Sequence, residues 1–293
     1  MKLNELQKRI LELKAERHAL LLAHNYQSLE VQQIADFVGD SLQLARKSSE
    51  IEGFDMVVFA GVRFMAEMAA ILTDIPVYIP AADAWCPLAG WVDADKIRAR
   101  RDEFPDAPVV VYVNTTAETK AECNVICTSG NAVDVVESLG ASQVLFGPDK
   151  NLAEYVRRQT DCEIIDIEPR GNCYVHKQFT PEDILRLKDD HPDAIAIAHP
   201  ECPPDVQDVS DIVGSTGRMV EIVAESSNKK FIIATEVGLV DQLQARHPDK
   251  MVIAARPTAV CRSMKKTTLE NIVHVLEDLP PDNLVTVPAD MID

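Results

Sequence analysis

The stretch PVVVYV at residues 108–113 begins the part of the sequence that decides the fold. It is continuous and rich in β-branched valine, as expected of a strand buried on both faces of a parallel sheet. Further elements follow as a helix at 117–121, a strand at 124–127, a helix ending at 139, a strand at 143–146, a helix at 152–159 and a strand at 163–167. Such alternation predicts βαβ crossovers and a parallel four-stranded sheet.

The same pattern recurs on both sides of this stretch, which indicates an internal triplication. The polar triplets that end the first strand of each copy are His24-Asn25-Tyr26, Tyr112-Val113-Asn114 and His199-Pro200-Glu201. The hydroxyl residues that follow 17 positions after each triplet begins are Ser41, Ser129 and Thr216. The cysteines that close the copies are Cys86, Cys173 and Cys261, at intervals of 87 and 88 residues.

Three markers that keep one period divide the chain into units 1–86, 87–173 and 174–261. A helix at 268–279 and a strand at 284–287 resemble the start of a fourth copy, so residues 262–293 are expected to pack back on the first unit. Ligands of parallel α/β units bind beyond the carboxyl ends of the strands. We therefore expect an α/β fold of three homologous αβα domains in pseudo-threefold arrangement around a central cavity.

Composition and charge exclude several classes of protein. A net charge of −18 disfavours nucleic acid and anionic membranes as partners. No apolar run approaches the roughly 18 residues of a membrane helix. The charged, helix-patterned residues 1–17 do not read as a signal peptide. A cytoplasmic location follows as an expectation, with seven cysteines kept reduced.

The three recurring hydroxyls have two interpretations. Ser, Thr and Asp are preferred at helix N-caps, so capping alone is one. The other is anion binding by free N–H groups at helix N-termini, which the glycines beside Ser129 and Thr216 favour by allowing close backbone approach. The triplets add residues that exchange protons, among them His24, Tyr26 and Glu201.

The three recurring cysteines indicate a metal site. No Cys-x-x-Cys occurs, which excludes zinc-ribbon, ferredoxin-type and thioredoxin motifs. Three thiolates suit a 4Fe–4S cluster that normally takes four, which leaves one iron open as a Lewis acid. A zinc site on the same thiolates is the alternative. The remaining cysteines, which lack repeat counterparts and are interpreted as structural, are Cys123, Cys127, Cys162 and Cys202.

Several longer motifs resemble the quinolinate synthase family over nearly the whole chain. They are AHNYQ (23–27), FVGDSLQLARK (37–47), VVVYVNTTAE (109–118), CTSGNAV (127–133), FGPDKNL (146–152), HPEC (199–202), VGSTGRM (213–219) and AVCRSMKKTTLENI (259–272). The resemblance implies condensation of iminosuccinate with dihydroxyacetone phosphate to quinolinate, phosphate and water, a step of de novo NAD biosynthesis. It also implies supply of iminosuccinate by an aspartate-oxidising enzyme.

The resemblance assigns roles to residues of this chain. The implied 4Fe–4S ligands are Cys86, Cys173 and Cys261, with one iron left without a protein ligand. Proton transfer is implied for Tyr26, His199 and Glu201. The implied substrate contacts are His24, Ser41, Tyr112, Val113, Asn114, Ser129, His199, Pro200, Glu201 and Thr216.

One departure from the family is that Cys261 is followed by Arg262-Ser263-Met264, so the Cys-x-x-Cys pair of some members, linked to redox control, is absent here. Three alternatives remain open at this point. They are another cluster-dependent hydro-lyase, a non-catalytic iron–sulfur electron carrier, and a metal-free repeat scaffold.

Overall fold

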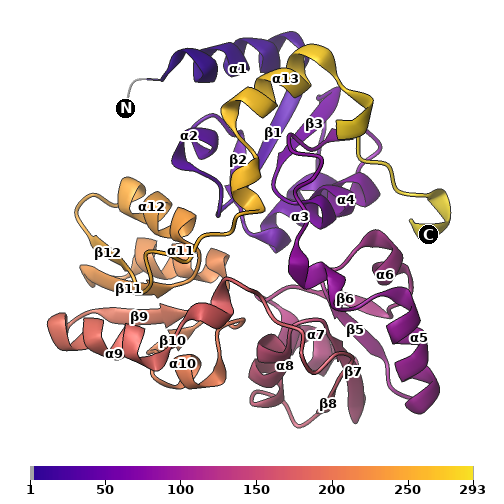
Figure 1. Ribbon diagram of the computed structural model, residues 1–293, viewed down its shortest axis with the longest axis vertical. Coiled ribbons are helices and arrows are strands. Elements are labelled where there is room, and N and C mark those ends of the chain that lie inside the picture. Colours follow the sequence, from indigo (N-terminus) through magenta and orange to yellow (C-terminus); the bar gives the residue numbers. More distant parts are fainter. Residues whose placement is uncertain (1–2, 293) are drawn as a thin grey trace. The chain divides into compact units, whose positions relative to one another are not determined.

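A computed structural model describes residues 3–292 of the chain and divides it into two compact units (Figure 1). The first unit holds residues 1–86 together with 261–293, and the second holds residues 87–260. One four-stranded sheet lies in the first unit and two lie in the second. All three sheets are parallel, as the alternation of strands and helices predicts.

The first unit is built around a single sheet. Its elements are α1 (Glu5–Glu16), β1 (Ala19–His24), α2 (Leu29–Gln32), β2 (Phe37–Gly39), α3 (Ser41–Ser49), β3 (Met56–Ala60), α4 (Arg63–Leu72), β4 (Val77–Tyr78), the 3₁₀ turn η3 (Met264–Lys266) and α13 (Leu269–Asp278). Strands β1 and β3 are buried at every position, which explains their continuous apolar sequence.

The second unit contains two sheets of the same design. The elements of the first sheet are α5 (Ala94–Glu103), β5 (Val109–Tyr112), α6 (Ala117–Ala121), β6 (Val125–Cys127), α7 (Ala132–Ser138), β7 (Gln143–Gly147), α8 (Lys150–Arg157) and β8 (Glu163–Asp166). Those of the second are η2 (His176–Gln178), α9 (Pro181–Asp190), β9 (Ile195–Ala198), α10 (Pro204–Asp208), β10 (Ile212–Val213), α11 (Thr216–Glu225), β11 (Lys230–Ala234), α12 (Val237–Arg246) and β12 (Met251–Ala254).

The three sheets share one strand order, in which the second strand of the copy lies outside the first and the third and fourth follow on the other side. The orders are β2-β1-β3-β4, β6-β5-β7-β8 and β10-β9-β11-β12. Corresponding strand ends therefore lie at corresponding places in every sheet. The polar triplets, hydroxyls and cysteines all follow strands, so each sheet presents its own set at its carboxyl edge.

The core of the first unit joins both ends of the chain. Ile10 and Leu13 of α1 pack with Ile272 and Leu276 of α13 and with the buried side chains of β1 and β3. Helix α13 begins after the N-cap Thr268, whose hydroxyl accepts from Asn271 N, and ends at Leu279 in the left-handed region, φ 47°. These bounds agree with the helix that the sequence predicts at 268–279.

The strand expected at 284–287 is wrong. Only Leu284 pairs, in an isolated antiparallel bridge with Tyr78, and Val285 N donates to Val77 O at 2.8 Å. The 3₁₀ turn η4 (Pro281–Asn283) follows α13. The segment after this turn runs antiparallel to β4 instead of crossing over to a parallel position. Beyond Val285, residues 286–288 form no further ladder with β4.

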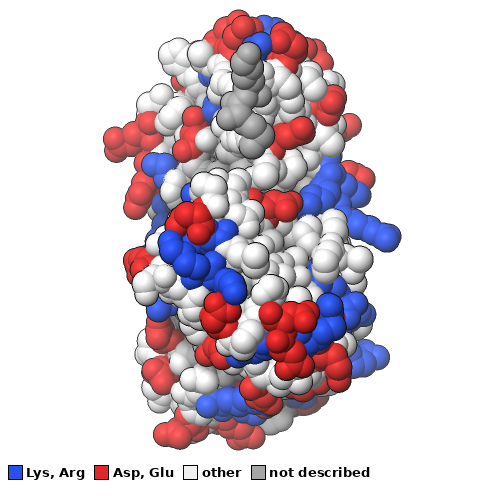
Figure 2. Space-filling view, turned by 90° about the vertical axis from the view of Figure 1, so that its left-hand side faces the viewer, with Lys and Arg blue, Asp and Glu red and all other residues white. Residues whose placement is uncertain are grey.

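Within residues 3–292, no helix is long and apolar enough to span a bilayer. On the face shown in Figure 2, basic side chains lie among acidic ones and form no continuous basic surface there. Many surface charges of the described residues are paired, as Arg158 is with Glu154 and Asp208.

Candidate functional site

The three recurring cysteines follow the fourth strand of their sheets, and one repeated hydrogen bond holds the loops that carry them. The N–H of the first residue of the preceding helix donates to the carbonyl two residues before the cysteine. The pairs are Arg63 N to Ala84 O at 2.9 Å, Lys150 N to Gly171 O at 2.9 Å and Val237 N to Ala259 O at 3.0 Å. Because this bond recurs in all three copies, each loop is fixed to its sheet in the same way.

The cysteine loop of the second unit is additionally held by Asp149, the N-cap of α8. One carboxylate oxygen of Asp149 accepts from Asn151 N and Leu152 N, and the other accepts from Cys173 N at 3.0 Å. Asn151 in turn donates to Glu201 O at 2.9 Å. The first turn of α8 therefore joins the loop of Cys173 to the segment that carries Glu201.

Of the seven cysteines, Cys127 and Cys202 are buried and the other five are half-buried. Burial raises the pKa of the thiols of Cys127, Cys162 and Cys202, and raises that of Cys123 to about 11. These four keep their protons at neutral pH and are poor metal ligands. The three recurring cysteines form no disulfide and are half-buried, as Cys123 and Cys162 are, so it is their place in the repeat that sets them apart.

The recurring cysteines fit the donor set of an iron–sulfur cluster. Fe–S clusters are held by thiolates, and the repeat supplies one half-buried thiol after the fourth strand of each sheet. Cys173 belongs to the second unit, whereas Cys86 and Cys261 belong to the first. No other cysteine of the chain recurs with the repeat, so the ligand set is confined to these three.

Capping does not account for the recurring hydroxyls. The N-cap of α3 is Asp40, which forms a capping box with Gln43, and the N-cap of α11 is Ser215, which accepts from Arg218 N. Ser41 and Thr216 are therefore the first residues of their helices. Ser129 lies in the turn before α7, and Gly130 in that turn lies against Ser215, since a Cβ there would be 3.2 Å from Ser215 Oγ. Two of the three hydroxyl turns thus meet within the second unit.

A buried hydrogen-bond network lies at the strand ends of the second unit. Glu201, which is 3% exposed, accepts from Tyr112 Oη at 2.6 Å through Oε1. Its Oε2 lies 2.6 Å from His176 Nδ1, and His176 Nε2 lies 2.8 Å from Thr235 Oγ1. The rings of His176 and His199 stack at 4.5 Å. The chain thus brings together three of the predicted residues, Tyr112, His199 and Glu201.

The two buried carboxyl groups of Glu201 and Asp149 have pKa values that are shifted in opposite directions. Burial by itself raises the pKa of Glu201, but His176, with His199 and Tyr112, outweighs it and leaves that pKa below its usual range. Burial, followed by the nearby charge of Glu201, raises the pKa of Asp149 well above its usual range. Glu201 is therefore ionised at neutral pH and accepts a hydrogen bond from Tyr112.

Two histidines of the triplets adopt the same local geometry. Tyr26 N donates to His24 Nδ1 at 3.1 Å, and Glu201 N donates to His199 Nδ1 at 3.2 Å. An Nδ1 atom that accepts leaves the proton of neutral imidazole on Nε2. His24 lies in the first unit beside Tyr26, with ring centroids 4.6 Å apart, and His199 lies in the second.

Asn114 has a buried side-chain oxygen, Oδ1, without a hydrogen-bond partner among the described residues. Such an atom is costly unless a ligand or water satisfies it. The other predicted contacts of the second unit, Val113 and Pro200, are buried and use main-chain groups internally. Val113 N donates to Cys127 O, and Pro200 O accepts from Gln207 Nε2.

Sequence reasoning missed three members of the network: Asp149, His176 and Thr235. Thr235 and Asp149 follow the third strands of their sheets, so the rule of polar residues at strand ends would have found them. His176 carries no such signal. Its counterparts at the same distance after Cys86 and Cys261 are Ala89 and Met264, neither of which carries a titratable group.

The sheets and the network define a class of protein: a triplicated α/β enzyme with a thiol at each sheet and a buried acid–base pair. Comparison with known proteins narrows this further. The profile of the family described as "Quinolinate synthetase A protein" matches residues 8–293, so the chain belongs to that family.

Curated relatives agree with the family match. A quinolinate synthase of Methanothermobacter thermautotrophicus is 50% identical over 290 residues, covering 99% of this chain and 94% of the relative. One from Pyrococcus furiosus is 47% identical, with coverage of 99% and 94%. One from Thermotoga maritima is 49% identical, with coverage of 92% and 89%. The family to which the sequence motifs point is confirmed.

Proposed function

We propose that this chain is a quinolinate synthase that condenses iminosuccinate with dihydroxyacetone phosphate, releasing phosphate and two molecules of water. The observation that carries the proposal is Glu201, held ionised in a buried network between Tyr112 and His176, in a chain of this family. A reaction that loses water and rearranges double bonds needs groups that accept and return protons. The ionised Glu201 and its hydrogen-bonded neighbours Tyr112 and His176 supply such groups.

In this proposal the residues of the second unit hold and deprotonate the substrates. His199 donates from Nε2 to a substrate carboxylate, since its Nδ1 is already an acceptor. Asn114 Oδ1 accepts a hydrogen bond from a substrate N–H or O–H group. The ten-residue helix α11 offers N-terminal N–H groups and the Thr216 hydroxyl to an anion such as phosphate.

In the first unit, His24 and Ser41 likewise bind substrate groups, and Tyr26 is a further proton carrier. Lys265 donates to Tyr26 O and thereby holds the main chain of that residue. Val113 and Pro200 act by shape, since both are buried beside residues of the network.

The cofactor of this proposal is a 4Fe–4S cluster on Cys86, Cys173 and Cys261. When bound, it supplies an open iron that polarises a substrate oxygen. This requires the domains to meet in the pseudo-threefold arrangement around a central cavity. An enzyme with seven cysteines and no disulfide among them suits a reducing compartment, so we place it in the cytoplasm. Its iminosuccinate would come from an aspartate-oxidising enzyme.

The experiment is an anaerobic assay with both substrates and identification of the products. We expect quinolinate and phosphate in equal amounts from protein that contains iron and sulfide. Protein that holds its cluster but forms no quinolinate would exclude this reaction and favour another hydro-lyase. Absence of iron from protein purified without oxygen would remove the cofactor from the proposal.

A further inference from the structure

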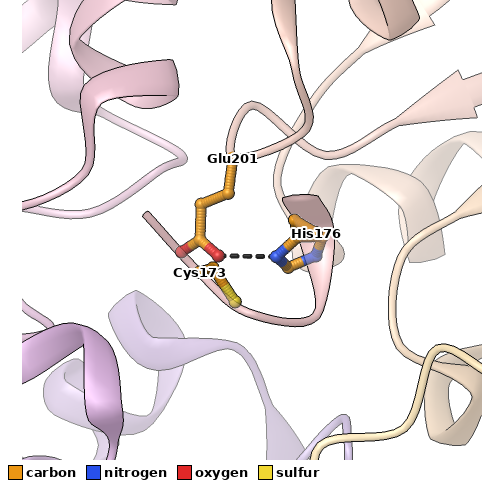
Figure 3. Close-up of side chains that lie close together, drawn as sticks. All are labelled: Cys173, His176 and Glu201. Atoms are coloured by element: carbon orange, nitrogen blue, oxygen red, sulfur yellow. Dashed lines mark hydrogen bonds and ion pairs between the residues drawn. The ribbon is translucent and has the colours of Figure 1, made fainter. Parts of the chain in front are cut away.

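Three different metal-binding groups converge in the second unit. Cys173, His176 and Glu201 each direct one donor atom into a space where all three atoms lie within 4.8 Å of one another (Figure 3). His176 and Glu201 are buried and Cys173 is half-buried. A thiol, an imidazole and a carboxylate are the three ligand types that zinc accepts in proteins.

The distances fit a metal with small adjustments. Tetrahedral zinc, with bonds of about 2.0 Å to nitrogen or oxygen and about 2.3 Å to sulfur, places its ligand atoms roughly 3.3–3.6 Å apart. Nδ1 of His176 and Oε2 of Glu201 are 2.6 Å apart, so the distance between them would increase slightly on metal binding. Sγ of Cys173 lies no more than 4.8 Å from either atom, and these two distances would shorten on metal binding.

The charges also balance. A thiolate from Cys173, the carboxylate of Glu201 and a neutral His176 would carry two negative charges, which a divalent cation cancels. Burying a neutral group of ions costs much less than burying a net charge. Binding would displace the thiol proton of Cys173 and any proton shared between His176 and Glu201.

Each ligand is held from behind by a second hydrogen bond. Thr235 Oγ1 lies 2.8 Å from His176 Nε2, and Tyr112 Oη donates to the Glu201 oxygen that does not face His176. Asp149 accepts from Cys173 N. Such partners fix ligand orientation in metal sites and typically contribute about 10–100-fold to affinity.

We propose that Cys173, His176 and Glu201 form a three-ligand site for zinc or a similar divalent transition metal, occupied when the protein holds no cluster, with water as the fourth ligand. The metal and the cluster exclude one another because they share Cys173, a consequence that rests on the proposed function. A metal bound here also occupies Glu201 and so blocks its use as a base.

The test is titration of Co²⁺ into the full-length, cluster-free protein without oxygen, followed by displacement with Zn²⁺. We expect visible bands of tetrahedral Co²⁺ and a near-ultraviolet charge-transfer band of one thiolate. His176→Gln and Cys173→Ser should remove these bands. Thr235→Val should weaken binding by about 10–100-fold, because it removes only the partner behind His176.

The matched controls are Cys86→Ser and Cys162→Ser, which should bind Co²⁺ like the unmodified protein. Loss of the bands in Cys86→Ser, or an intensity equal to three thiolates, would place the metal on the recurring cysteines and overturn the proposal, as would an unmodified protein that binds no Co²⁺. The same Cys86→Ser variant should fail to assemble the cluster if the proposed function holds. The two proposals can therefore fail separately.

Discussion

Glu201 is the residue whose environment decides most about the chemistry. It is buried, ionised and held by Tyr112 and His176 at 2.6 Å each. Its amide N–H also positions His199, since it donates to the Nδ1 atom of that ring. Glu201 thus links Tyr112 of β5, His176 of η2 and the turn after β9 that carries His199.

Glu201→Gln keeps the size of the side chain but removes the charge. We expect kcat to fall at least about 100-fold, the lower limit for losing a general base, with iron content unchanged. Steady-state assays together with iron analysis measure both. Glu221→Gln, the same change at a half-exposed surface residue paired with Arg218, is the control and should leave kcat unaffected. Near-normal turnover of Glu201→Gln would exclude it as the base.

Glu168 makes stability depend on pH. Hydrogen bonds from Arg170 and Lys96 lower the pKa of Glu168 to about 2. Its folded pKa lies below its unfolded value of 4.5, so the stabilisation is present above that value and disappears as the pH falls towards about 2. Because Arg170 is mostly exposed, we expect only about 1 kcal/mol.

The measurement for Glu168 is urea unfolding of the metal-free protein and its Glu168→Gln variant at pH 7 and at pH 3. The free energy of unfolding of the two should differ more at pH 7 than at pH 3. A difference that stays constant between these pH values would show that the charge of Glu168 contributes nothing.

At the scale of elements, the turn before α8 and the loop of Cys173 are fitted closely together. Gly171 lies against this turn, and a Cβ added to it would come within 1.8 Å of Pro148 O. Lys150 N also donates to Gly171 O. The loop therefore cannot take a side chain at this position without moving the backbone that carries Cys173.

Gly171→Ala should destabilise the protein by about 1–3 kcal/mol or more, since the clash is with backbone and cannot be relieved by a rotamer change. Thermal or urea unfolding measures this. Gly90→Ala is the control, because a Cβ there has no atom within 4 Å. Equal stability of the two variants would contradict the close fit.

Elements were also the level at which sequence reasoning was most reliable. The helix at 117–121 matches to the residue, and the strands at 143–146 and 163–167 match within one residue. Their signals are local, because apolar continuity marks the strands and Thr116 caps the helix with its side chain. The strand at 284–287 failed because its pairing depends on a turn and a partner strand distant in sequence.

At the scale of the whole molecule, triplication gives every sheet an equivalent cysteine loop. Cys173→Ala should remove the cluster and leave the fold intact, with a stability change within about 1 kcal/mol, because this side chain is only half-buried. Iron analysis and circular dichroism measure the two effects. Cys162→Ala, at a half-buried cysteine outside the repeat, should retain iron. Iron at wild-type stoichiometry in Cys173→Ala would refute the ligand assignment.

The sequence by itself determined the triplication, the class of fold and the family, because each is written in short-range patterns and in spacing. It also marked Tyr112, His199 and Glu201 as strand-end residues, but not their contacts. Tyr112 and Glu201 are 89 residues apart, and His176 reaches Thr235 across 59. Only the tertiary structure decided that His176 joins Glu201 and that Asp149 holds Cys173, because packing of two sheets within one unit brings these residues together and no local pattern records it.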